Sequence, residues 1–200
     1  MILKVCGITN QPDADAAIAA GATAIGFNFY PKSPRYIAPA AAAGIRSKPG
    51  VRRVGVFVNE TRARVDEIVR IAALDVAQLH GDESPGDYPG CVPVWKAARV
   101  VEGFDFSQYD SCPAEALLLD GPAGVLYGGA GRSFDWRLAG VSARRIILAG
   151  GLDASNVTQA VALVRPWGVD ACSRIESAPG KKDYKKMTEF LQAARAALGR

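Results

Sequence analysis

Apolar residues gather into eight short runs along the chain, separated by polar and glycine-containing stretches. The runs are rich in Val, Ile, Leu and Ala, and several are closed by Gly or a polar residue. Short apolar runs of this kind are typical of strands buried on both faces in a parallel sheet. The predicted strands are Ile2–Cys6, Ala24–Phe29, Arg53–Val58, Val76–His80, Pro93–Ala97, Ala116–Asp120, Arg145–Ala149 and Gly168–Cys172.

Helix signals follow several of these runs. Pro12–Gly21 has Pro and acidic residues in its first turn and a closing Gly, which mark the start and end of a helix. In Arg62–Ala73, apolar residues recur at helical spacing. Further helices are predicted from Pro39, over Asp153–Val164 and over Tyr184–Leu198. Only a short helix is indicated after the fourth strand, and the stretch after the fifth gives no clear prediction.

This alternation predicts the fold class. Eight strands, each followed by a helix or by room for one, with no break in composition, indicate an α/β protein with a single (β/α)8 barrel of the TIM type over residues 1–200. An open doubly wound sheet is disfavoured, because Cys6-Gly7-Ile8-Thr9 after the first strand is not a Gly-rich dinucleotide fingerprint.

Composition narrows the range of partners. The 200 residues are 49% hydrophobic with a net charge of +4. This mild basic balance suits an anionic metabolite and is too small and scattered to indicate nucleic acid. The basic cluster Lys181, Lys182, Lys185 and Lys186 is predicted to be the solvated start of the last helix. We find no signal peptide and no run that could span a membrane.

The cysteines and the histidine argue against a metal centre. Cys6, Cys91, Cys112 and Cys172 lie far apart without a C-x-x-C or Cys/His spacing, so neither a zinc site nor a disulfide framework is predicted. This usage fits a reducing cytoplasm, the localisation that we expect. His80 is the only histidine, which excludes a three-histidine metal site.

Side chains suited to chemistry stand at several predicted strand ends. In an eight-stranded barrel these ends meet at one face, so residues far apart in the sequence become neighbours. The candidates are Cys6, Gln78, His80, Asp120 and, from the loop after the second strand, Arg35. A thiol at Cys6 and a carboxyl at Asp120, facing each other across the mouth, can act as a proton-transfer pair. The alternative is structural, since buried cysteines and lone histidines are common in cores.

Two loops have the composition of phosphate sites. Gly150-Gly151 follows the seventh strand, and Ser173–Lys182 follows the eighth. Loops at these two positions often bind phosphate in this fold, although two glycines can also be an ordinary tight turn. The Gly-rich stretch Tyr127–Trp136 is interpreted as a lid over bound ligand or, alternatively, as a flexible surface loop.

Eight motifs spread over nearly the whole chain occur in the order of one family. They are Lys4–Thr9, Gly26–Tyr36, Val54–Asn59, Gln78–Glu83, Leu118–Asp120, Gly128–Trp136, Leu148–Leu152 and Pro179–Asp183. In these motifs the chain closely resembles phosphoribosylanthranilate isomerase of tryptophan biosynthesis. The resemblance implies a cofactor-free Amadori rearrangement of N-(5-phosphoribosyl)anthranilate to 1-(2-carboxyphenylamino)-1-deoxyribulose 5-phosphate.

The resemblance also implies roles for individual residues. Asp120 would be the general acid that protonates the furanose ring oxygen, and Cys6 the general base that removes the proton from C2. Arg35 would hold the anthranilate carboxylate, for which a bidentate guanidinium is well suited. The implied substrate-binding set, including the phosphate loops, is Arg35, Gln78, His80, Gly150, Gly151, Ser173 and Arg174.

One motif departs from the family. Where the family typically reads Val-Asp-Val-Ser-Ser-Gly-Val-Glu, residues 169–176 read Val-Asp-Ala-Cys-Ser-Arg-Ile-Glu. Arg174 therefore replaces a Gly in a phosphate loop, and it either points away or adds its charge to the phosphate. We favour the second hypothesis.

Two alternatives to this function stay open at this point. A related sugar-phosphate isomerase of histidine biosynthesis shares fold and chemistry, but its pattern has an Asp where this chain has Cys6. A barrel that only binds a phosphorylated metabolite is the other. We expect a small phosphorylated substrate as partner and a monomer, with a homodimer as the alternative.

Overall fold

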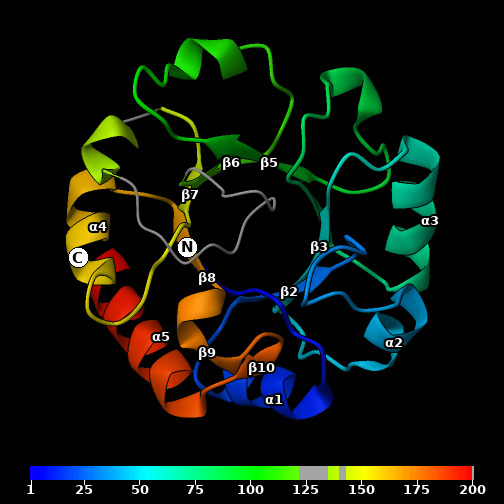
Figure 1. The fold of residues 1–200 in the computed structure, drawn as a ribbon, viewed down its shortest axis with the longest axis horizontal. Coiled ribbons are helices and arrows are strands. Elements are labelled where there is room, and N and C mark those ends of the chain that lie inside the picture. The colour runs from blue at the N-terminus through cyan, green and yellow to red at the C-terminus, as the bar shows by residue number, and fades with distance from the viewer. Residues whose placement is uncertain (122–134, 140–142, 200) are drawn as a thin grey trace.

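The computed structural model describes residues 1–121, 135–139 and 143–199, and its strands form a closed parallel barrel (Figure 1). The strands follow one another in chain order, and the last one pairs with the first. The predicted eight-stranded α/β barrel is therefore confirmed. The strands are β1 (Ile2–Val5), β2 (Ala24–Asn28), β3 (Arg52–Phe57), β4 (Val76–Leu79), β5 (Val94–Arg99), β6 (Ala116–Asp120), β7 (Ile146–Leu148) and β8 (Gly168–Ala171).

Helices surround the barrel, as Figure 1 shows. They are α1 (Gln11–Ala19), α2 (Pro39–Gly44), α3 (Arg62–Ile71), α4 (Val157–Val164) and α5 (Tyr184–Leu198). After β4 and β5 the chain has short 3-10 turns in place of helices, η1 (Pro85–Asp87) and η2 (Phe106–Tyr109). Two more such turns are η3 (Trp136–Ala139) and η4 (Ser173–Ile175). No helix in the described residues is both long and apolar enough to cross a bilayer.

Local sequence explains where the helices begin. The side chains of Asn10, Thr61 and Asp183 accept hydrogen bonds from backbone N–H groups in the first turns of α1, α3 and α5. Short polar side chains at this position satisfy donors that have no partner inside the helix.

Alternation along the strands sorts the side chains into two cores. Leu3, Ile25 and Phe27 belong to a large core that joins the strands to the helices. A second core takes residues from seven strands and fills the inside of the barrel. Its members are Ile2, Ala24, Val54, Val76, Trp95, Ala97, Ala116, Leu118, Ile147 and Ala149.

The loop after β8 has more structure than the sequence indicated. It forms η4 and then a two-stranded antiparallel sheet, β9 (Glu176–Ala178) with β10 (Lys181–Lys182). Lys182 is 3% exposed and forms an ion pair with Glu176, with Nζ 2.8 Å from Oε1. The prediction that Lys182 belongs to a solvated basic cluster is therefore wrong, because a buried carboxylate holds it inside the fold.

Candidate active site

Cys6 follows directly after β1 and is nearly buried, at 8% exposed. Its backbone N–H donates to the carbonyl of Ala171 over 2.9 Å, so it continues the ladder between β1 and β8. Opposite, on β2, stands Gly26. A β-carbon there would lie 2.9 Å from Cys6 Sγ and 3.0 Å from Lys4 Cε, so the missing side chain of Gly26 leaves the space in which Cys6 and Lys4 meet.

The surroundings of Cys6 favour its thiolate. A hydrogen bond with the Cys172 side chain lowers the pKa of Cys6 most, burial opposes this, and the positive charge of Lys4 lowers the pKa further, to well below its usual value. A thiolate is the form of cysteine that can take up a proton.

Lys4 and Asp170 form a buried ion pair next to Cys6. Lys4 is fully buried, and its Nζ lies 2.9 Å from Asp170 Oδ2. Burial raises the pKa of Asp170 to about 7 against the attraction of Lys4, and the charge of Cys6 adds to the rise. Burial lowers the pKa of Lys4, but Asp170 and Cys6 outweigh it and the pKa is raised overall. The carboxyl of Asp170 and the thiol of Cys6 thus both interact with the buried ammonium group of Lys4.

Asp120 ends β6 and faces His80, the residue after β4. His80 Nε2 lies 3.3 Å from Asp120 Oδ2, and both side chains are mostly buried, at 11% and 15% exposed. The other ring nitrogen, Nδ1, lies 3.0 Å from the side-chain amide of Gln78. The predicted site residues Gln78, His80 and Asp120 therefore form one chain of polar contacts at the strand ends.

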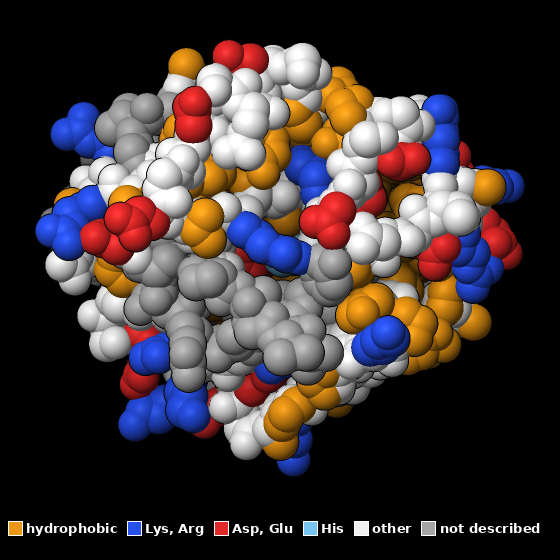
Figure 2. Space-filling view, turned by 45° about the horizontal axis from the view of Figure 1, so that its top comes forward, with side chains coloured by type: hydrophobic (Ala, Val, Ile, Leu, Met, Phe, Trp, Pro, Cys, Tyr) orange, Lys and Arg blue, Asp and Glu red, His pale blue; other side chains and the backbone are white. Residues whose placement is uncertain are grey.

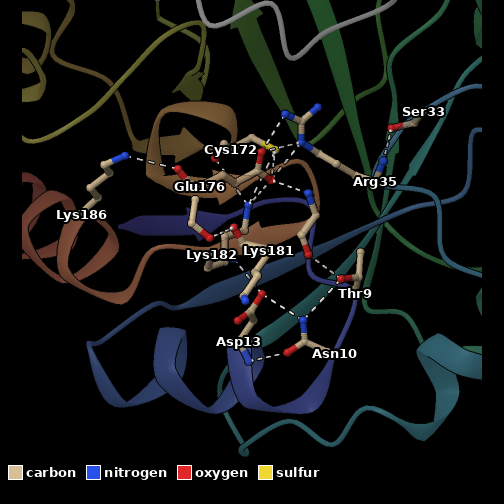
Figure 3. A network of polar contacts seen from close by, with 12 residues as sticks. Thr9, Asn10, Asp13, Ser33, Arg35, Cys172, Glu176, Lys181, Lys182 and Lys186 are labelled. Atoms are coloured by element: carbon tan, nitrogen blue, oxygen red, sulfur yellow. Dashed lines mark hydrogen bonds and ion pairs between the residues drawn. The ribbon is translucent and has the colours of Figure 1, made fainter.

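Arg35, in the segment after β2, is held by Glu176, which begins β9 after the last barrel strand. Its Nε and Nη2 donate to the two carboxylate oxygens of Glu176 over 2.8 to 3.1 Å. Figure 3 shows this pair together with Lys182 and Cys172. Burial raises the pKa of Glu176, but the hydrogen bonds and charges of Arg35 and Lys182 outweigh burial and lower the pKa overall. The contact between Arg35 and Glu176 is therefore an ion pair.

The loops after β7 and β8 approach each other at the same end of the barrel. Gly150 and Gly151 have φ of 81° and 66°, a conformation that favours glycine. Ser173 begins η4, and Arg174 after it is 43% exposed. Arg174 Nε donates to Asp153 Oδ2 over 2.6 Å, so its side chain joins the two loops.

Charged side chains of both signs are interspersed on the described part of the face drawn in Figure 2. Most of the predicted lid Tyr127–Trp136 falls in 122–134, outside the described residues. Among the side chains that the structure describes, no group of three or more His, Cys, Asp or Glu is arranged to hold a metal ion.

Sequence reasoning did not single out four residues of this site. They are Lys4, Asp170, Cys172 and Glu176. For the first two a signal was present, because a Lys and an Asp each interrupt an apolar run that was predicted to be buried. A charge in such a run needs a partner inside the fold.

Comparison with known proteins gives one consistent family. A family model for N-(5'phosphoribosyl)anthranilate (PRA) isomerase matches residues 3–193. The N-(5'-phosphoribosyl)anthranilate isomerase of Solibacter usitatus is 76% identical over 199 residues, covering 100% of both chains.

Solved structures agree. The phosphoribosyl anthranilate isomerase of Thermus thermophilus superimposes with a TM-score of 0.87 at 38% identity, covering 98% of this chain and 99% of that one. The Thermotoga maritima protein is 36% identical, and its structures cover 98% of this chain and 100% of that one, each with a TM-score of 0.84. One is a complex with reduced 1-(o-carboxyphenylamino)-1-deoxyribulose 5-phosphate, and the other describes monomers generated from a dimeric protein.

Proposed function

The chain belongs to the N-(5'-phosphoribosyl)anthranilate isomerase family, and from this premise we propose how its residues carry out the isomerisation in tryptophan biosynthesis. The reaction is an Amadori rearrangement, which moves protons and needs an acid and a base but no cofactor. The observation that carries the proposal is the pair of strand ends that present a buried thiol, Cys6, and a mostly buried carboxyl, Asp120, at the same face.

Asp120 acts as the general acid in this proposal. It donates a proton to the ring oxygen of the ribose, the bond between that oxygen and C1 breaks, and the anthranilate nitrogen stabilises C1 as a Schiff base. The contact between Asp120 Oδ2 and His80 Nε2 supports this role, because His80 holds the carboxyl in place while Gln78 orients the imidazole ring.

Cys6 acts as the general base. Its thiolate removes the proton from C2, the electrons of that bond move toward the nitrogen, and the resulting enolamine rearranges to the aminoketose product. Support comes from the lowered pKa of Cys6, to which the hydrogen bond with Cys172 contributes most and the Lys4 ammonium adds. A lowered thiol pKa favours the thiolate, which is the form that acts as the base.

Arg35 binds the carboxylate of the anthranilate ring. Because Nε and Nη2 of Arg35 are engaged by Glu176, the substrate carboxylate reaches the guanidinium through the remaining nitrogen, Nη1. Gly150, Gly151 and Ser173 offer backbone N–H groups to the phosphate at the other end of the substrate.

Arg174 strengthens phosphate binding in this proposal, by turning from Asp153 toward the phosphate or by keeping the two loops together. We expect an Arg174→Gly variant to raise the Michaelis constant about tenfold, the loss of one exposed charge-assisted contact, with little change in kcat. Steady-state kinetics of the two proteins test this. An unchanged Michaelis constant would show that Arg174 has no part in phosphate binding.

The function itself is tested by following the loss of fluorescence of N-(5-phosphoribosyl)anthranilate, generated in the cuvette, on addition of the purified protein. We expect turnover without added metal or cofactor. Folded protein without turnover would contradict the proposal. Turnover of the histidine-pathway aminoaldose in the same assay series would identify a second substrate.

We propose a monomer in a reducing cytoplasm. The described cysteines are all free thiols, which supports a reducing compartment. The Thermotoga maritima relative is described as a dimeric protein. Light scattering coupled to gel filtration therefore decides between monomer and dimer for this chain.

A further inference from the structure

Residues of β1 and β8 meet in pairs along the line where the barrel closes. Val5 pairs with Ala171 and Lys4 with Asp170. The 2.9 Å ion pair between Lys4 and Asp170 shows that paired side chains on the barrel interior touch across this line. Side-chain direction repeats every second residue along a strand. Cys6 and Cys172 each lie two positions after Lys4 and Asp170, directly beyond the last pair of the ladder, so both are placed on the same inner side.

The spacing of this pair suits a disulfide. Neighbouring strands lie about 4.8 Å apart, and disulfides form between residues whose Cα atoms are about 4.4–6.8 Å apart. The Cys172 sulfur also leans toward the chain around Cys6, because a β-carbon on Gly7 would lie 3.0 Å from it. The two side chains also act on each other's pKa, lowering that of Cys6 and raising that of Cys172.

The two sulfurs differ in character, because the pKa of Cys6 is lowered whereas the interaction with Cys6 and burial raise the pKa of Cys172 against the charge of Lys182. Lys182 Nζ lies 4.0 Å from Cys172 Sγ, and Figure 3 shows Cys172 within the cluster formed by Arg35, Glu176 and Lys182. The lowered pKa of Cys6, due first to the hydrogen bond from Cys172 and then to Lys4, leaves a thiolate at the strand end. Ionised thiols next to a second thiol are prone to oxidise to disulfides.

We propose that Cys6 and Cys172 are a redox-active pair, which a peroxide converts into a disulfide across the junction of β1 and β8. The disulfide removes the thiolate of Cys6, whose sulfur can then no longer accept a proton, so the isomerase becomes inactive until a thiol reduces the bond. The loss of activity rests on the proposed role of Cys6 as base, whereas the formation of the disulfide does not.

The chemistry balances with hydrogen peroxide as the oxidant. The Cys6 thiolate attacks one peroxide oxygen, the O–O bond breaks, hydroxide leaves, and a sulfenic acid forms on Cys6. Cys172 then attacks this sulfur, the S–O bond breaks, and the oxygen leaves as water once it takes up a proton. In sum, two thiols are oxidised to one disulfide while one peroxide is reduced to two waters.

The full-length protein is tested by treatment with hydrogen peroxide, blocking of free thiols, and digestion with trypsin. The peptides that carry the two residues, Val5–Lys32 and Ile146–Arg174, contain no other cysteine. We expect them to appear joined, and activity to fall about a hundredfold, as for loss of a general base. Dithiothreitol should separate the peptides and restore the activity.

Two variants sharpen the test, each measured against its own untreated activity. Cys172→Ser keeps a hydrogen-bond donor but cannot close the bond, so peroxide should drive Cys6 to higher oxidation states and dithiothreitol should no longer restore activity. Cys91→Ser removes an exposed thiol and should respond like the unchanged protein. Absence of the joined peptides, or full recovery of Cys172→Ser, would overturn the proposal. Joined peptides with activity retained would support the pair but overturn the role of Cys6 as base.

Discussion

Asp120→Asn and Cys6→Ala are each expected to lower kcat by at least the ~10²–10⁴ typical of one proton-transfer group. Asparagine keeps the shape of Asp120 but cannot give up a proton to the ring oxygen. Alanine at position 6 removes the sulfur that lies beside Lys4 and acts as the proposed base. The Michaelis constant should change little in either variant, because neither group is proposed to bind the ground state of the substrate.

The measurement is the same fluorescence assay at saturating substrate, with circular dichroism to confirm that each variant folds. Cys112→Ala is a matched control, since this thiol contacts Tyr88, 3.2 Å away, in the outer core. It should keep a kcat near that of the unchanged protein. If Asp120→Asn retained a kcat within tenfold, Asp120 would not be the acid, and His80 would be the next group to test.

Lys4→Met is expected to lower the free energy of unfolding at neutral pH by about 3–5 kcal/mol, the cost of leaving one partner of a buried ion pair without the other. The carboxylate of Asp170 would then be buried without a counter-charge, 8% exposed. Its pKa, already about 7 because of burial, should rise further in the folded variant.

The sign of the pH dependence follows from this rise. Because the folded variant binds a proton at Asp170 more tightly than the unfolded chain does, its stability is highest below the unfolded pKa of about 4 and falls as pH increases toward the folded value. Urea unfolding at several pH values measures this slope. The double variant Lys4→Met/Asp170→Leu should recover most of the loss, since apolar replacement of a buried pair is often nearly neutral. A Lys4→Met protein as stable as the original at neutral pH would contradict the argument.

The strands could be predicted because their apolar runs are local signals. Ala116–Asp120 was predicted with the bounds that β6 has. The first and last runs were predicted to reach Cys6 and Cys172, whereas β1 ends at Val5 and β8 at Ala171. The difference is small but informative, since the chemically interesting residues lie just beyond the paired region, where backbone and side chain can face a ligand.

The helices and loops were less predictable where long-range contacts decide the structure. The sequence of Ser173–Lys182 predicts a loop, yet this stretch forms η4 and the β9–β10 sheet. Glu176 holds this segment by bonds to Lys182 and to Arg35, which is 141 positions away in the chain. No local sequence pattern predicts a contact between residues so far apart in the chain. Likewise α4 begins at Val157 and not at Asp153, because the Asp153 side chain instead caps the turn at Ser155.

The candidate site was predictable as a set of positions but not as a set of contacts. Strand-end reasoning identified Cys6, Gln78, His80 and Asp120, and the structure joins the last three in one polar chain. That Asp170 is the carboxylate beside Lys4 depends on how β1 registers with β8. Register is a property of the closed barrel, so it appears only in three dimensions.

Because β1 pairs with β8, the site is complete only after β8 has been synthesised. Lys4 and Cys6 are synthesised before Asp170 and Glu176, which lie more than 160 positions further along the chain. A chain that ends before β8 lacks Asp170, which forms the ion pair with Lys4, and Glu176, which forms the ion pair with Arg35. Isomerase activity therefore requires that translation has passed β8, and an unfinished chain carries Cys6 without Cys172, the neighbour that lowers its pKa most.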